Sequence, residues 1–188
     1  MKKLAVLVAS ILVLAGCKVD METEVNLNDL SAKDSKIVDG HLNFEVPSCT
    51  SHEDSRKESN SLIKIKEKVP TIFREAKYVE CYSKKFNSYA HFTIPVNVGE
   101  LDGEGKVLDA DVYWFASPKE KIAMGILLTK ELRARINKSQ KNEINKMDLN
   151  FSVKINKEAT PLRVNVLGAF MTGADGTFTL SSIPGGKD

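Results

Sequence analysis

Histidines and acidic residues are the side chains of this chain whose types suit acid–base chemistry or metal binding. His52, Glu53 and Asp54 form the only local cluster of such residues. Adjacent residues at the start of a helix point in different directions around its axis, so these three do not converge on one ion. We interpret them as a solvated first turn whose acids suit the helix dipole. The sequence therefore predicts no metal site and no cofactor.

A second acidic group consists of Asp102, Glu104, Asp109 and Asp111, around two glycines. It lacks the residue order and the terminal Glu of a calcium-binding loop, so we interpret it as a polar turn between strands. The sequence contains neither the nucleophile elbow Gly-x-Ser-x-Gly nor the phosphate loop Gly-x-x-x-x-Gly-Lys. A Ser/His/Asp set assembled from distant positions remains open.

Tyrosines on two neighbouring predicted strands form a candidate binding surface. If Val79 and Cys81 face the core, alternate residues of that strand face the other way, and the strand after the turn at Lys84–Asn87 does likewise. This surface would carry Tyr78, Tyr82, Tyr89 and His91. Aromatic rings with hydroxyl groups suit a ligand or a protein partner. Burial of the same rings beneath another layer is the alternative.

A basic helix is the second candidate surface. The segment from Lys130 to about Lys141 places Leu128, Leu132 and Ile136 one turn apart, with basic residues around the remainder. The candidates for contact with anionic headgroups or lipopolysaccharide phosphates are Lys130, Arg133, Lys138 and Lys141. A solvated helix face without a partner is the alternative.

The first 17 residues have the organisation of an export signal. Two lysines precede an apolar run over residues 4–14, and Leu14-Ala15-Gly16-Cys17 follows. As a helix the run is about 16 Å long, roughly half of what is needed to span a bilayer. The segment resembles the bacterial lipoprotein signal peptide, whose final cysteine receives a diacylglyceryl group and becomes the first residue of the mature chain. The resemblance implies that Cys17 is the lipid-attachment site and that residues 1–16 are removed.

The same resemblance implies acyl chains on Cys17, palmitate among them, that hold the protein on a bilayer. An Asp directly after the acylated cysteine would retain the protein in the inner membrane. Lys18 stands there instead, which favours the outer membrane, with the domain in the periplasm or at the cell surface. The whole chain resembles small lipoproteins carried by enteric bacteria and their prophages. A phage-borne version would block a surface receptor and exclude superinfecting phage.

Export leaves Cys49 and Cys81 as an even pair in an oxidising compartment, which is typical of a disulfide. In the entropic model the loop that such a bridge closes is worth roughly 3 to 4 kcal/mol. Two buried free thiols are the alternative. Neither cysteine belongs to a Cys-x-x-Cys pair, so the bridge indicates stability rather than redox catalysis.

Alternation of apolar and polar residues predicts most of the strands. The predicted strands cover residues 19–27, 41–46, 77–84, 88–98, 147–155 and 161–171. Strands with one polar face are typical of antiparallel sheets. The first strand starts two residues after the lipidated cysteine, so the domain is expected to lie directly on the bilayer surface.

Two segments have helical periodicity: the basic helix and the stretch between Cys49 and Cys81. In the latter, Ser51 with Asp54 resembles a capping box, and Pro70 is expected to end one helix near Lys68 and to start a second. A strand at Ile63–Lys66 is the alternative. Helices and sheet each need an apolar partner. We predict an α+β fold with a mostly antiparallel sheet and two helices packed on one face, in two layers.

The composition, 42% hydrophobic and 28% charged over 188 residues, is typical of one globular domain. Two of the 27 basic residues, Lys2 and Lys3, belong to the leader, so the mature chain has 25 basic against 25 acidic groups. A neutral domain disfavours nucleic-acid binding. The predicted organisation is a signal peptide over 1–16, a single domain over 17–182 and a flexible C-terminal tail over 183–188.

These features together predict a membrane-anchored envelope lipoprotein that is not an enzyme and binds another envelope component. Its expected partners are the lipid bilayer, through acylated Cys17, and an envelope protein or lipopolysaccharide. The alternative is a periplasmic hydrolase with a dispersed active site. A deep polar cleft with a histidine and a carboxylate in contact would favour the enzyme, whereas a shallow aromatic or basic face would favour the binding protein.

Overall fold

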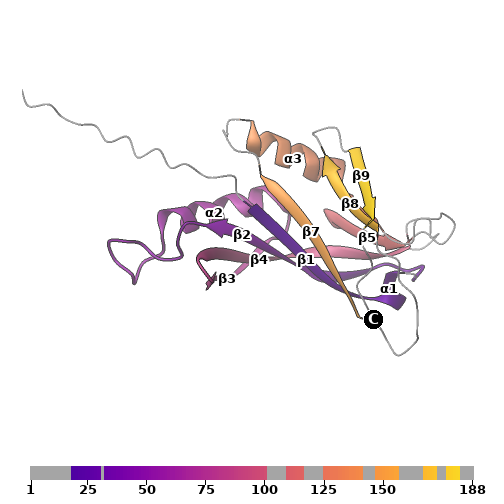
Figure 1. Cartoon of the computed structure of the whole chain (residues 1–188), viewed down its shortest axis with the longest axis horizontal. Helices are drawn as coiled ribbons and strands as arrows, with labels where there is room; N and C mark the ends of the chain where they lie inside the picture. The colour runs from indigo at the N-terminus through magenta and orange to yellow at the C-terminus, as the bar shows by residue number, and fades with distance from the viewer. Residues whose placement is uncertain are drawn as a thin grey trace, which may run out of the picture.

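A computed structural model describes residues 18–30, 32–100, 109–116, 125–141, 147–156, 167–172 and 177–182. The strands in this part of the chain are β1 (Lys18–Asn26), β2 (Lys36–Val46), β3 (Lys77–Lys84), β4 (Asn87–Glu100), β5 (Val112–Ala116), β6 (Gly125–Leu128), β7 (Asp148–Asn156), β8 (Leu167–Thr172) and β9 (Thr177–Ser182). The helices are α1 (Leu27–Leu30), α2 (Asn60–Ile72) and α3 (Lys130–Gln140) (Figure 1). The predicted leader and the predicted tail lie outside these residues.

The strands form one curled, mixed sheet and a separate β8–β9 hairpin. The order in the large sheet is β6-β5-β4-β2-β1-β7, and β3 also pairs with β4. The β1–β7 and β4–β5 pairs are parallel, and the others are antiparallel. The prediction of a mostly antiparallel sheet is therefore wrong, because a polar face shows only that one side of a strand meets solvent and does not fix the direction of its neighbour.

Strand β4 organises the sheet. One of its edges pairs with β2 from Ser88 to Val98, and the other edge is shared by two strands in succession. Strand β3 pairs with β4 up to Thr93, and β5 pairs with β4 from Val96 onward. The long alternating run in the sequence thus forms a central strand with two short strands placed end to end beside it.

The alternation that predicted the strands also separates the two faces of the sheet. Val19, Met21, Leu42, Phe44 and Phe92 are buried on one face, in the same cluster as apolar side chains of α2 and α3. The residues between them in sequence are polar and partly exposed. We call these two surfaces the core face and the outer face.

Helix α2 departs from its prediction at both ends. Its N-cap is Ser59, whose hydroxyl accepts a hydrogen bond from the Leu62 amide at 3.1 Å, so the expected cap at Ser51 is wrong. Pro70 lies in the last turn and does not divide the helix, which continues to Ile72. Because Pro70 lies in the last turn, the one backbone hydrogen bond that it cannot donate is lost near the end of the helix. The break expected from a mid-helix proline therefore does not occur. The alternative strand at Ile63–Lys66 is also wrong.

Helix α3 begins and ends close to its predicted limits. The Thr129 hydroxyl accepts a hydrogen bond from the Leu132 amide at 3.2 Å, which caps the first turn. Leu132 and Ile136 are buried in the core cluster, as the apolar stripe predicts.

Cys49 and Cys81 are joined by a disulfide with a Cα–Cα distance of 5.7 Å, in agreement with the sequence-based prediction. Cys81 lies on β3 opposite the buried Ala90, and Cys49 lies in the segment that connects β2 to α2. The Cys49 carbonyl accepts a hydrogen bond from the amide of Ser59, the N-cap of α2. The bridge therefore fixes the entry to α2 against the edge of the sheet.

Candidate functional site

A β-bulge in β3 divides the predicted row of tyrosines between the two faces. The register shifts between Tyr78 and Glu80, so Tyr78 lies opposite Phe92, whereas Tyr82 lies opposite Tyr89. Tyr78 consequently packs against the core-face residue Phe92, with ring centroids 5.5 Å apart. Val79, expected in the core, is half exposed at the bulge. Tyr78 therefore does not belong to the candidate surface. The extra residue of the bulge turns the side chains that precede it in β3 to the opposite face of the sheet.

Tyr82 and Tyr89 remain on the outer face, as the sequence predicts. Their rings stack with centroids 5.6 Å apart. The Tyr82 hydroxyl donates a hydrogen bond to Asn43 Oδ1 at 3.1 Å, and Asn87 Nδ2 donates one to the Tyr89 hydroxyl at 3.4 Å. Burial, and then the neighbouring Tyr89, raise the pKa of Tyr82, so its hydroxyl stays a donor at neutral pH. The two rings form a preorganised aromatic surface.

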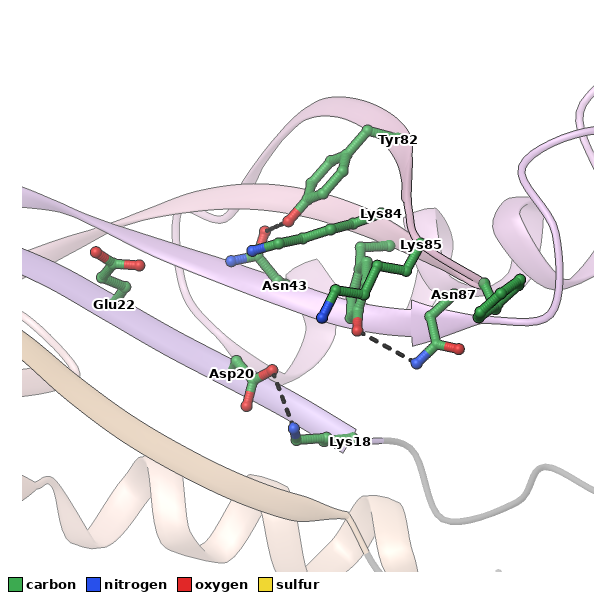
Figure 2. Close-up of a pocket in the computed structure, with 10 residues that line it drawn as sticks. Lys18, Asp20, Glu22, Asn43, Tyr82, Lys84, Lys85 and Asn87 are labelled. Carbon is green, nitrogen blue, oxygen red and sulfur yellow. Dashed lines mark hydrogen bonds and ion pairs between the residues drawn. The ribbon is translucent and has the colours of Figure 1, made fainter.

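These tyrosines form part of an open groove of about 450 Å³ on the outer face. Figure 2 shows side chains from β1, β2 and β3 around it, with Lys18 and Asp20 on one side and Tyr82 and Lys84 on the other. Its lining residues are Lys18, Asp20, Glu22, Asn43, Tyr82, Lys84, Lys85, Phe86, Asn87 and Tyr89. Asp20 is engaged within the protein, since it lies 3.6 Å from Lys18 Nζ and accepts a hydrogen bond from Asn150 Nδ2 at 3.2 Å.

The β3–β4 hairpin forms one end of the groove. Its two-residue turn is Lys85–Phe86, with Lys84 paired to Asn87 at the ends of the strands. The Phe86 side chain is fully exposed, and Lys85 has a φ of 57°, in the left-handed region. The sequence predicts this turn, but not the exposed aromatic and basic side chains at its tip. The available signal was a phenylalanine directly after two lysines, at a position where turns favour Gly, Asn or Asp.

His91 lies on the outer face as predicted, and it contacts a second histidine. His41 Nδ1 lies 3.0 Å from His91 Nε2, at hydrogen-bond distance between the neighbouring strands β2 and β4. Burial and the nearby His41 lower the pKa of His91, although Glu80 acts in the opposite direction. The geometry requires one ring nitrogen to donate and the other to accept, so at least one ring must be neutral.

Asp111 lies in a buried ion network on the core side of the sheet, which the sequence analysis missed. Its carboxylate accepts hydrogen bonds from the Arg74 amide at 2.9 Å, from Arg74 Nε at 3.0 Å and from an Arg135 terminal nitrogen at 2.6 Å. Arg135 Nε also donates to the Ile72 carbonyl at 2.6 Å, at the C-terminal end of α2. The network therefore ties α2 to β5 and α3.

The electrostatics of this network are those of a saturated structural site. Burial alone would raise the pKa of Asp111, but the hydrogen bonds from Arg135 and Arg74 outweigh it and lower the pKa. Arg74 also holds the exposed Asp109 through two hydrogen bonds of 2.9 and 3.1 Å. Asp109 and Asp111 are therefore partners of arginines. Asp102 and Glu104 of the predicted acidic turn lie outside the described residues.

The basic helix presents its lysines as predicted. Lys130, Lys138 and Lys141 are exposed, whereas Arg133 is only partly so. Arg135 is used internally by Asp111. The helix is thus less basic toward solvent than its sequence suggests.

The described residues contain no group of three or more His, Cys, Asp and Glu side chains placed to hold a metal. In the cluster at 52–54, Asp54 accepts two hydrogen bonds from the Arg56 guanidinium, at 2.9 and 3.1 Å. The cluster lies in a turn that precedes α2, not in the first turn of the helix as expected. Cys17, the predicted lipid-attachment site, lies outside the described residues.

Comparison with known proteins gives a family. The model of a family described as a domain of unknown function, DUF7424, matches residues 19–185. The chain belongs to this family. No curated protein and no solved structure matches it. None of the described helices has the length and apolar character needed to cross a membrane.

Proposed function

We propose that this DUF7424 protein is a lipoprotein, anchored to the outer membrane through acylated Cys17, that binds another envelope component through the outer-face groove. We further propose that α2, α3 and the sheet make up a two-layer α+β domain that supports the groove. The observation that carries the proposal is the position of Lys18. This residue lines the groove and is joined by one peptide bond to Cys17, the proposed lipid-attachment site.

The short connection supports a site that works close to a membrane. Strand β1 begins at Lys18 and is paired with β2 from Val19 and with β7 from Lys18. Consecutive Cα atoms are about 3.8 Å apart, so an acyl group on Cys17 would hold the groove within a few ångströms of the lipid headgroups. A partner of the groove would then be a membrane component or the membrane-proximal part of an envelope protein.

The chemistry of the groove supports binding rather than catalysis. Stacked tyrosines, two amides, two carboxylates and three lysines surround an open space, as in a recognition surface. A hydrolase would need a histidine placed by a carboxylate and directed at a nucleophile. In the described part of the chain, the hydrogen-bond partner of His91 is His41. The hydrolase remains the second candidate, and labelling of the purified protein by a fluorophosphonate, which reacts with activated serines, would favour it.

The lipid anchor is tested by Cys17→Ser. Cells fed an alkynyl fatty acid should label the wild-type protein and not the variant, because the variant lacks the thiol that would receive the acyl group. Label that persists in the variant would contradict the assignment.

Binding at the groove is tested by photo-crosslinking in living cells. A benzophenone amino acid placed at Tyr89 should give a discrete adduct with one envelope component. The matched control is the same amino acid at Ile63, which is exposed on α2. The adduct should weaken with Tyr82→Ala, which removes the ring stacked on Tyr89. Equal adducts from both positions would contradict a specific site in the groove.

A further inference from the structure

We infer that the tip of the β3–β4 hairpin, Lys84-Lys85-Phe86, is a second and non-covalent membrane contact, in which Phe86 enters the lipid interface and the two lysines bind lipid phosphates. This inference rests on the proposed lipid anchor. A second contact would fix the orientation of the domain on the bilayer, whereas a flexible acyl anchor alone leaves the domain free to rotate.

The exposure of Phe86 is the first feature that supports this contact. This side chain is fully exposed, and the other large apolar side chains with substantial exposure among the described residues are only about half exposed. A phenylalanine at the end of a two-residue turn contributes nothing to the core. Transfer of an exposed aromatic ring from water into the interface is favourable, and amphipathic membrane-binding segments use Phe, Trp and Leu for this purpose.

The backbone of the turn is the second observation. Lys85 adopts a φ of 57°, a conformation that costs a side chain about 1 kcal/mol or more and that Gly adopts without cost. The fold would be served better by Gly at this position. The lysine therefore places a positive charge beside Phe86 at the expense of local stability, which is a pattern found at functional surfaces.

The lysines are the third observation. In the described part of the chain, neither Lys84 nor Lys85 forms an ion pair, and both line the groove that also contains Lys18. The acid nearest the start of β1, Asp20, is held by Lys18 and Asn150. Two ammonium groups beside an exposed phenyl ring match the phosphates and the acyl boundary of an anionic bilayer.

The position of the hairpin tip relative to Lys18 is the fourth feature that supports this contact. Figure 2 shows Lys18 and Lys85 facing the same groove from opposite sides, β1 and the hairpin. Because Lys18 is the residue next to the proposed acylation site, an inserted anchor brings the groove close to the headgroups and the hairpin tip within reach of them. The rival surface, α3, exposes lysines but has no large apolar side chain that is exposed, so it lacks the component that would enter the interface.

The direct test uses the full-length acylated protein reconstituted in vesicles of phosphatidylethanolamine and phosphatidylglycerol. The only natural tryptophan, Trp114, is buried and supplies a constant background. Phe86→Trp should add emission that shifts to shorter wavelength and is quenched by lipids with brominated acyl chains. Val79→Trp is the matched control, because Val79 is exposed on the same hairpin but five residues from Lys84, about 17 Å along the strand. Its emission should not be quenched.

A second test removes the anchor. Purified Cys17→Ser protein should bind phosphatidylglycerol vesicles weakly, and Lys84→Gln with Lys85→Gln should lower the partition coefficient about fivefold for each lysine. Lys130→Gln with Lys138→Gln, on α3, should change it little. A larger loss from the α3 pair would overturn the inference and assign the contact to that helix.

Failure of the inference is distinguishable from failure of the lipoprotein proposal. Acylated, membrane-bound protein in which Phe86→Trp is not quenched would leave the anchor intact and overturn the hairpin contact. Emission that shifts without quenching by brominated lipid would also overturn it, because a second copy of the chain would then cover the tip. Absence of acyl label on Cys17 would instead refute the proposed anchor.

Discussion

The two faces of the sheet use charged residues in opposite ways. On the core side, Asp111 is 3% exposed and is satisfied by Arg74 and Arg135. At the outer groove, lysines and an exposed phenylalanine surround stacked tyrosines, and part of the backbone is strained. On the first face a buried carboxylate is satisfied by the protein's own arginines, whereas at the groove Lys84, Lys85 and Phe86 face solvent, in keeping with the proposed external contact. Changes on the core side should therefore cost stability, and changes at the groove should cost binding.

The largest loss is expected for the disulfide on the core side. Cys49→Ser with Cys81→Ser should lower the free energy of unfolding by about 3 to 4 kcal/mol, because the reduced chain gains the entropy of an open loop. Urea denaturation followed by circular dichroism measures this difference. Wild-type protein in reductant is the control and should match the variant. Equal urea midpoints for oxidised wild type and variant would contradict the prediction.

A smaller loss is expected for Asp111→Asn, which leaves two arginines without their buried carboxylate. We expect about 2 to 3 kcal/mol, below the usual 3 to 5 for a buried pair because Arg74 is 46% exposed and solvent screens part of the interaction. Asp109→Asn is the matched control. Asp109 is 81% exposed and binds the same arginine, so its loss should cost less than about 0.5 kcal/mol. Similar effects of the two variants would remove the contrast between the buried and the exposed carboxylate.

The pH dependence of stability should separate the two faces. The pKa of His91 is lowered in the folded protein, so its contribution to stability is complete above the unfolded pKa of about 6.5 and is lost as the pH falls toward the folded pKa. The pKa of Asp111 is also lowered, and its contribution is lost only as the pH falls below about 3.9 and through the folded pKa.

We therefore expect two steps in a plot of melting temperature against pH. His91→Gln should remove the step below pH 6.5, and Asp111→Asn should remove the step below pH 4. Each variant should keep the step that belongs to the other face. A single step shared by both variants would show that the two groups do not titrate independently.

The smallest expected effect has the opposite sign. Lys85→Gly should raise the free energy of unfolding by up to about 1 kcal/mol, because the left-handed backbone at this position no longer conflicts with a side chain. The greater conformational entropy that glycine gives the unfolded chain offsets part of this gain. Glu75→Gly, at the other non-glycine residue of positive φ in the described chain, provides a comparison in a turn away from the groove. A loss of stability for Lys85→Gly would show that the lysine supports the fold rather than an external contact.

Local patterns predicted much of the fold. Alternation located β1, β3, β4 and β7 within a residue or two, because period-two burial is a property of each strand alone. The helix at Lys130–Gln140 followed from its apolar stripe, and the Cys49–Cys81 pair followed from setting Cys17 aside as the expected lipid-attachment site. Tyr82, Tyr89 and His91 were correctly placed on one face for the same reason as the strands.

The errors have a common physical origin. Tyr78 was misplaced because a bulge in β3 depends on its pairing with β4, and no local signal marks the extra residue. The N-cap of α2 is Ser59 and not the predicted Ser51, because several serines precede the helix and each could cap it. The contact of Ser59 with the disulfide residue Cys49 is a tertiary feature that the local sequence does not reveal. Asp111 appeared to be a loop acid because its partners, Arg74 and Arg135, are distant in sequence.

The sequence by itself determined which residues alternate and which segments are apolar on one side, since each of these depends on neighbouring residues alone. Only the tertiary structure decided that β1 pairs in parallel with β7, that Asp111 is buried between two arginines, and that Lys18 shares a groove with the hairpin tip. These features join residues up to 130 positions apart. Their energies arise when the chain folds and brings such residues into contact, and local composition carries no record of that contact.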